Sequence, residues 1–148
     1  LLHTCVETSG CAAWEIIAGI TPAIDLFLYD LKAIDPSKHK RLTGFDNELV
    51  LKNFERLVAA GREVIARVPI IPNQNDSEED LAMLIEFLHQ RAPCIRIDLL
   101  PYHRLGRSKY DRLGISYPLG DLEPPPPERM EEIRQRLIKA GFTVTIGG

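Results

Sequence analysis

The chain has 148 residues, 45% of them hydrophobic and 26% charged, a composition typical of one soluble globular domain, which we expect to span residues 1–148. A formal net charge of −3 argues against a general nucleic-acid-binding surface. No apolar run approaches the roughly 20 residues that a transmembrane helix needs, and we recognise no signal peptide. The expected location is therefore the cytoplasm, with no membrane partner.

Strand patterns and helix patterns alternate along the chain. In the first half, the expected elements are a strand at 2–8, a weak helix at 12–20, a strand at 25–32, a short helix at 37–43, and a helix at 47–60 that Gly61 caps. In the second half they are a strand at 64–71, a helix that Asp76 and Glu79 start as a capping box, a strand at 95–100, a helix after the prolines at 124–127, and a strand at 143–146. Such alternation favours parallel strands joined by right-handed helical crossovers.

About five strands are too few for a closed eight-stranded barrel, which typically takes roughly 250 residues. The sequence therefore predicts an α/β half-barrel or a small open parallel sheet. In both cases the carboxyl ends of the strands lie along one edge, where α/β proteins carry their chemistry. We expect one site from the polar residues at these ends, which are Glu7, Thr8, Asp30, Lys32, Arg67 and His103.

The charged residues at the strand ends also have structural interpretations. Asp30 and Lys32 lie on one face of an apolar strand, where they form either a site or a structural ion pair. Arg67 interrupts an apolar strand and needs an anion, which is either a ligand or an acid such as Asp98. Glu7 precedes a turn signal and can instead mark the point where the chain leaves the sheet.

The histidines and cysteines carry weaker signals. His103 follows a strand directly and is either a site residue or a hydrogen-bonded structural residue. The two histidines in charged helical contexts are expected to face solvent, and these are His39 and His89. The cysteines form no Cys-x-x-Cys pair, which argues against a disulfide framework and a closed zinc site. Each of them is expected to be a small buried residue, and these are Cys5, Cys11 and Cys94.

Four segments together resemble the glycyl-radical enzyme activating enzymes, of which pyruvate formate-lyase activating enzyme is the type member. They are TCVETSG at 4–10, DLFLYDLK at 25–32, KHKRLTG at 38–44 and LLPYHRLGRSKY at 99–110. The resemblance continues in the correct order to the terminal TIGG at 145–148, so it covers nearly the whole chain.

The resemblance implies a radical S-adenosylmethionine protein with a partial, six-stranded (β/α) barrel. Such a protein binds a 4Fe-4S cluster, cleaves S-adenosylmethionine to a 5′-deoxyadenosyl radical, and abstracts hydrogen from a backbone glycine of a partner. The implied partners are a pyruvate formate-lyase-like glycyl-radical enzyme and an electron donor such as flavodoxin or ferredoxin.

The resemblance also implies roles for individual residues. The implied S-adenosylmethionine pocket is lined by Asp30, Leu31, Lys32, Arg67 and His103. Positions that hold a monovalent cation in the type member correspond to Glu7, Thr8, the Leu28 carbonyl and Asp30. Many relatives carry Asp where this chain has Glu7.

One departure from the family is clear. The family holds its cluster in a Cys-x-x-x-Cys-x-x-Cys loop, and this sequence contains neither that motif nor the family's glycine-rich loop. The chain also starts inside a strand-like run without an initiator Met. We therefore expect the C-terminal part of an activating enzyme, with about the last four barrel strands and a C-terminal strand. We also expect it to be inactive alone, with the cluster loop encoded upstream.

Three further points stay open at this stage. Without a cluster, a half-barrel can be a non-catalytic module that binds a nucleoside or a partner. Lys32 at a strand end can also serve an unrelated barrel lyase as a Schiff-base amine. The segment 104–127 is longer than most connections and is either a lid or partner-docking surface, or a disordered connector.

Overall fold

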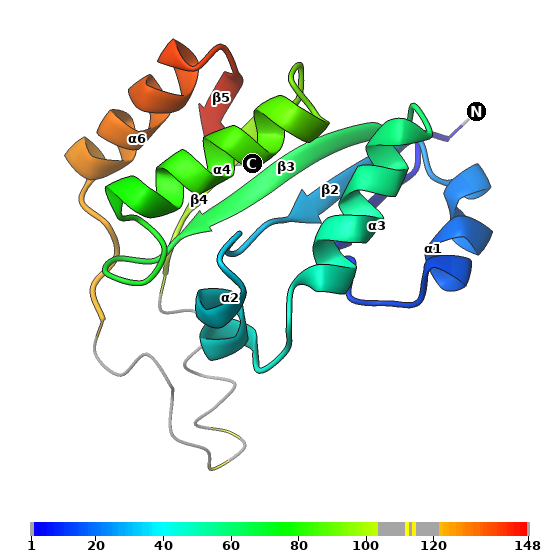
Figure 1. Ribbon diagram of the computed structural model, residues 1–148, viewed down its shortest axis with the longest axis horizontal. Helices are drawn as coiled ribbons and strands as arrows, with labels where there is room; N and C mark the ends of the chain where they lie inside the picture. The colour runs from blue at the N-terminus through cyan, green and yellow to red at the C-terminus, as the bar shows by residue number, and fades with distance from the viewer. Residues whose placement is uncertain (1, 104–111, 113, 115–121, 148) are drawn as a thin grey trace.

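One parallel sheet organises the computed structural model of this protein, which describes residues 2–103, 112, 114 and 122–147 (Figure 1). Within these residues the sheet has five strands in the order β1-β2-β3-β4-β5, so neighbours in the chain are neighbours in space. The strands are β1 (Cys5–Thr8), β2 (Leu26–Asp30), β3 (Glu63–Ile70), β4 (Arg96–Pro101) and β5 (Thr143–Ile146). The predicted five-stranded α/β architecture is confirmed.

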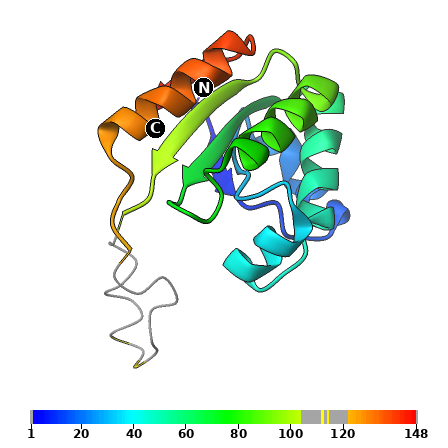
Figure 2. The same ribbon diagram turned by 60° about the vertical axis from the view of Figure 1, so that its left-hand side comes forward.

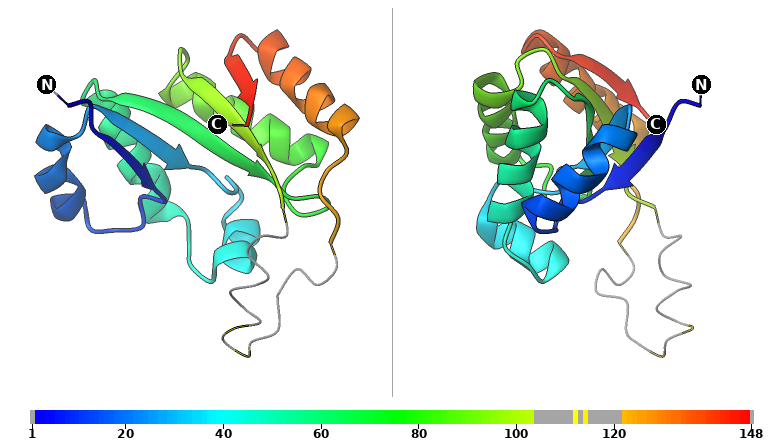
Figure 3. Two further views of the ribbon diagram at one scale, coloured as in Figure 1. Left: turned by 180° about the vertical axis from the view of Figure 1, so that it is seen from behind. Right: turned by 90° about the vertical axis from the view of Figure 1, so that its right-hand side faces the viewer.

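The helices lie mainly on one face of this sheet. They are α1 (Trp14–Ile20), the short 3-10 helix η1 (Thr21–Ala23), α2 (Pro36–Thr43), α3 (Glu48–Ala59), α4 (Glu78–Arg91) and α6 (Pro127–Lys139). Seen from behind, the strands lie in front of α3, α4 and α6, and no described helix covers the other face of the sheet (Figure 3). We call this other side the open face. The short helix α2 lies beyond the carboxyl ends of β2 and β3 (Figure 1).

The alternation of side chains along β2 explains which face is covered. Phe27 and Tyr29 point to the helices and are 1% and 0% exposed. Tyr29 meets Phe54 of α3 edge to face, with 5.4 Å between the ring centroids. Leu28 and Asp30 point to the open face and are only partly buried. The apolar residues of β2 therefore attach the sheet to the helix layer, and its polar end remains accessible.

The helix boundaries follow from local chemistry, with one correction. Gly61 follows α3 with a φ of 66°, as expected for the residue that ends a helix. The capping box of α4, however, uses Ser77 and Asp80, whose side chains each bond the other's backbone N–H. The predicted box on Asp76 and Glu79 was wrong by one residue, because the Asp76 carboxylate instead accepts from the Asn73 N–H at 2.7 Å.

Two other expectations about burial were wrong. All three cysteines are exposed: Cys5 on the edge strand β1, Cys11 in the loop after it, and Cys94 in the loop before β4. His39 is 5% exposed rather than solvated, because its ring turns toward the chain that follows α2. His89 is exposed as expected, and it stacks on Phe142.

The sheet is strongly twisted, and the carboxyl ends of its strands point toward the same edge of the molecule (Figure 2).

Within the described ranges, no helix combines the length and apolar character that crossing a membrane requires. Most of the expected lid or connector, 104–127, lies outside the described residues.

Candidate functional site

A row of polar residues crosses the open face near the carboxyl edge. The strand register aligns Asp30 of β2 with Arg67 of β3, and Arg67 with Asp98 of β4. Thr145 of β5 ends the row beside Asp98. Register partners in a parallel sheet lie side by side on the same face, so the topology brings together side chains that are far apart in the sequence.

Arg67 finds its anion on β1 rather than on β4. Its Nη1 lies 2.7 Å from the Glu7 carboxylate, and the Arg67 side chain is 16% exposed. Asp98 was the acid that the sequence analysis named for this role, but it accepts from Arg96 at 3.1 Å and from the Thr145 hydroxyl. Glu7 therefore remains in the sheet and contributes its charge to the open face.

The carboxyl group of Asp30 lies in a partly buried and charged environment. Burial raises the pKa of its carboxyl above the ordinary value, and nearby Glu7 acts in the same direction. The positive charges of Lys32 and Arg67 oppose this shift without cancelling it. Among the described residues, Asp30 Oδ1 and Arg67 Nε are buried atoms without a hydrogen-bond partner. Such atoms usually mark a place where a ligand or water completes the bonding.

Lys32 lies two residues beyond the end of β2, and the segment that carries it is held firmly. The buried side chain of Asn75 donates to the Lys32 carbonyl at 2.7 Å and to the Pro69 carbonyl at 2.6 Å. Asn47, also buried, donates to the Ala33 and Ile34 carbonyls at 3.2 and 2.7 Å. Two asparagines thus fix three successive carbonyls after β2. Sequence reasoning missed both, although Asn75 stands in the turn directly after β3.

Leu31 and His103 differ in what they can contribute to the site at the carboxyl edge. The Leu31 side chain is 2% exposed and belongs to the apolar core, and its N–H donates to the Arg67 carbonyl at 2.8 Å. Leu31 can therefore offer a ligand only backbone atoms. His103 follows β4 at the carboxyl edge and is exposed. The structure thus brings Glu7, Asp30, Lys32 and Arg67 together, while His103 lies at the end of another strand.

The loop after β1 is shaped by a close contact with Tyr29. A Cβ on Gly10 would lie 1.6 Å from the Tyr29 hydroxyl oxygen, so only glycine fits there. Asn53 of α3 is fully buried and donates to the Gly10 and Ala12 carbonyls, both at 2.8 Å. These bonds set the direction in which the chain leaves β1.

A cavity of about 460 Å³ opens at this edge of the sheet. Asp30 and Lys32 line one part of it, and His39 and Phe45 of the α2 region line another. The His39 Nδ1 is hydrogen-bonded to the Phe45 carbonyl at 2.9 Å, which holds the ring in place. The charged end of β2 therefore borders a space large enough for a small molecule.

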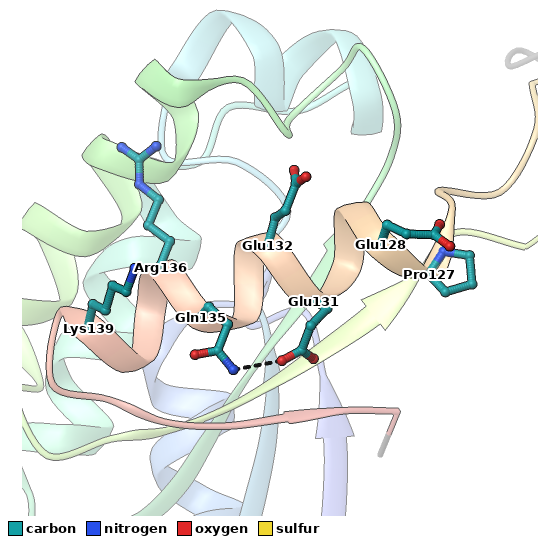
Figure 4. Close-up of a pocket in the computed structure, with 7 residues that line it drawn as sticks. All are labelled: Pro127, Glu128, Glu131, Glu132, Gln135, Arg136 and Lys139. Carbon is teal, nitrogen blue, oxygen red and sulfur yellow. Dashed lines mark hydrogen bonds between the residues drawn. The ribbon is translucent and has the colours of Figure 1, made fainter.

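Another hollow lies on the outside of α6 (Figure 4). All of its lining residues come from that one helix, and most of them are charged or polar. Gln135 and Glu131 bond each other across it at 2.7 Å. It is the solvated side of a surface helix, away from the strand ends, so we do not assign it to the site.

Comparison with known proteins places this geometry in a family. No family model matches the chain. It is 37% identical to the trans-4-hydroxy-L-proline dehydratase activating enzyme of Clostridioides difficile and 38% identical to the choline trimethylamine-lyase activating enzyme of Oleidesulfovibrio alaskensis. These matches cover 99% and 98% of this chain.

A solved structure decides the assignment. The chain matches a crystallised domain of the pyruvate-formate lyase-activating enzyme from Bacteroides vulgatus with a TM-score of 0.80 and 30% identity. The match covers 99% of this chain and 82% of that domain. The chain belongs to the glycyl-radical enzyme activating enzymes. A radical SAM methyltransferase from Sphaerobacter thermophilus shares the fold, with a TM-score of 0.72 at 19% identity.

This activating-enzyme chain spans about half the length of its curated relatives, 49% and 48% of the two named above. For the family cofactor S-adenosylmethionine, the donor set fits. Its methionyl end carries a carboxylate and an ammonium, which complement Lys32 and Arg67 on one side and Asp30 on the other. The unpartnered Asp30 Oδ1 and Arg67 Nε provide hydrogen-bonding capacity.

The family's iron-sulfur cluster does not fit the residues present. The three cysteines are exposed and lie on separate parts of the fold. Among the described residues, no group of three or more His, Cys, Asp or Glu side chains could hold a metal ion. We therefore assign no cluster chemistry to this chain.

Proposed function

We propose that this chain holds the methionyl end of S-adenosylmethionine within an activating enzyme that makes a glycyl radical on a partner enzyme of the pyruvate formate-lyase type. The observation that supports this most is the alignment of Asp30 with Arg67, next to Lys32, on the accessible face of the sheet. A carboxylate beside two cations complements a bound amino-acid group, and charge-assisted hydrogen bonds are the strong ones.

Each residue has a distinct part in this proposal. Lys32 and Arg67 bind the cofactor's carboxylate, and Asp30 accepts from its ammonium. Leu31 contributes backbone atoms, because its side chain is in the core. His103 adds a directional contact from the end of β4. The cofactor supplies the hydrogen abstraction, and these residues bind and orient it.

The remaining parts of the proposal come from the family. The chain acts as part of a larger protein, and its match to about half the length of the relatives supports this. Cluster ligands belong to the rest of that protein. The partner is a glycyl-radical enzyme, the electron donor is a flavodoxin or ferredoxin, and the location is cytoplasmic. No observation favours a Schiff-base lyase or a non-catalytic module.

Calorimetric titration of S-adenosylmethionine into the complete, cluster-loaded enzyme under anaerobic conditions tests the proposal. Lys32→Ala and His103→Ala each remove a contact to a charged or polar ligand group, which costs on the order of 1.5–3 kcal/mol. Affinity should fall roughly ten- to a hundred-fold. Lys32→Arg should restore little of the affinity, because a planar guanidinium group replaces a compact ammonium group.

The matched control is Lys52→Ala, which removes a lysine from an exposed ion pair with Glu48 in α3. It should leave the affinity unchanged. If Lys32→Ala and His103→Ala also bind like the wild type, with unchanged melting temperatures, these residues do not hold the cofactor.

A further inference from the structure

We propose that the Arg67 guanidinium is the built-in counter-ion of Glu7 and takes the place that a monovalent cation would have at the end of β1. Resemblance to the type member implied a cation held by Glu7, Thr8, the Leu28 carbonyl and Asp30. In this fold those donors are arranged differently. The inference rests on their geometry in the chain without bound cofactor, and it involves the same Asp30, Lys32 and Arg67 to which the proposed function assigns the methionyl group.

Glu7 reaches Arg67 across an intervening strand. Their side chains bridge from β1 to β3 over β2, a span of two strand spacings, roughly 9.5 Å. The contact closes at 2.7 Å. Two long side chains are needed for this bridge, and an Asp in place of Glu7 would be one methylene shorter. The length of the Glu7 side chain is therefore what makes the pair possible.

Two of the other expected ligands do not converge with Glu7. Side chains alternate along β1, so Thr8 points to the helix-covered face. Its hydroxyl accepts a hydrogen bond from the Gly10 N–H at 3.0 Å. Leu28 lies in a strand that is paired on both sides, so its carbonyl belongs to a hydrogen-bonded ladder. Glu7 and Asp30 remain as the acidic pair.

The charges around that pair are already balanced. Glu7 and Asp30 face Arg67 and Lys32, which makes two carboxylates and two cations. A metal cation between the two acids would have the guanidinium as a close neighbour of like charge, which is unfavourable where the groups are partly buried. The adjacent acid of β4, Asp98, does not alter this balance, because Arg96 pairs with it.

Thermal unfolding of the purified protein in potassium, sodium or choline chloride at equal ionic strength tests this inference. The wild type should melt at the same temperature in all three salts. In Glu7→Asp the shorter side chain no longer reaches Arg67. A monovalent cation can then bind between the carboxylates of residue 7 and Asp30. This variant should melt lower in choline by about 1–4 °C and regain stability as potassium or sodium is added, with saturation.

Sodium NMR relaxation provides a direct second measurement, with line broadening expected for Glu7→Asp and none above background for the wild type. Glu48→Gln, in an exposed pair with Lys52, is the control and should show neither effect. If Glu7→Asp does not fold, Arg67→Gln is the substitute variant, because it removes the guanidinium from Glu7 and Asp30 and should give the same cation response. A saturable cation response in the wild type overturns the inference, and so does the lack of any response in the folded variant.

Discussion

The Tyr29 hydroxyl donates a 2.6 Å hydrogen bond to the Val50 carbonyl and thereby joins β2 to α3 directly beneath the carboxyl edge. Burial raises the pKa of this hydroxyl well above its ordinary value, so it stays a donor. Gly10 lies against the same ring. Tyr29 thus connects the sheet to the helix layer and also restricts the conformation of the loop that follows Glu7.

Gly10→Ala should therefore destabilise the fold. The new Cβ would overlap the Tyr29 hydroxyl, and the φ of 67° at this position is unfavourable for an L side chain. Overpacking and strain together should lower the free energy of unfolding by about 2–4 kcal/mol. Chemical denaturation measures this. Gly19→Ala is the control, since it has open space and an ordinary backbone in α1, and it should be neutral or slightly stabilising.

Asn75→Ala should loosen the segment that carries Lys32. The change leaves the Lys32 and Pro69 carbonyls and the Ile71 N–H without their partner. Unsatisfied buried groups should lower the free energy of unfolding by about 2–4 kcal/mol. Gln90→Ala, on the exposed side of α4, should have almost no effect. Equal stability of Asn75→Ala and the wild type in urea would show that these bonds are replaceable by water.

Asp30→Asn should stabilise the folded protein at neutral pH. Because burial raises the pKa of Asp30, the folded state binds more protons than the unfolded chain between the ordinary and the raised pKa. The contribution of Asp30 to stability is thus most favourable at low pH and falls as the pH rises through the folded-state pKa. The neutral amide avoids this loss.

Melting temperatures measured from about pH 7 to about pH 4 check this expectation. The advantage of Asp30→Asn should be largest at the upper end and should shrink as the wild-type carboxyl becomes protonated. Asp25→Asn is a contrasting control, because hydrogen bonds from Thr4 lower the pKa of Asp25. An Asp30→Asn protein that is less stable at neutral pH would mean that the attraction of Lys32 and Arg67 outweighs burial.

The chain alone should bind no iron-sulfur cluster. Cluster ligation requires grouped thiolates, whereas the three cysteines lie on an edge strand and in two separate loops. Anaerobic reconstitution with iron and sulfide, followed by desalting, should leave a colourless protein. Retention of stoichiometric iron with cluster absorption would contradict this prediction.

The sequence alone determined the elements of the fold and the position of the polar edge. Hydrophobic periodicity is a local property, so the strands and helices could be placed from it within a few residues. Parallel topology then required the carboxyl ends to share an edge. For this reason the proximity of Asp30, Lys32 and Arg67 was predictable before their contacts were known.

Only the tertiary structure decided which groups actually meet. The sequence argument named only Asp98 as an acid for Arg67. Asp98 lies beside Arg67 in the register but pairs with Arg96, and the Glu7 side chain is long enough to reach Arg67 across β2. Asn75 holds Lys32 through a contact between residues 43 positions apart, which no local pattern records. Burial of His39 and exposure of the cysteines likewise depend on how distant segments pack, because burial is a property of the assembled chain.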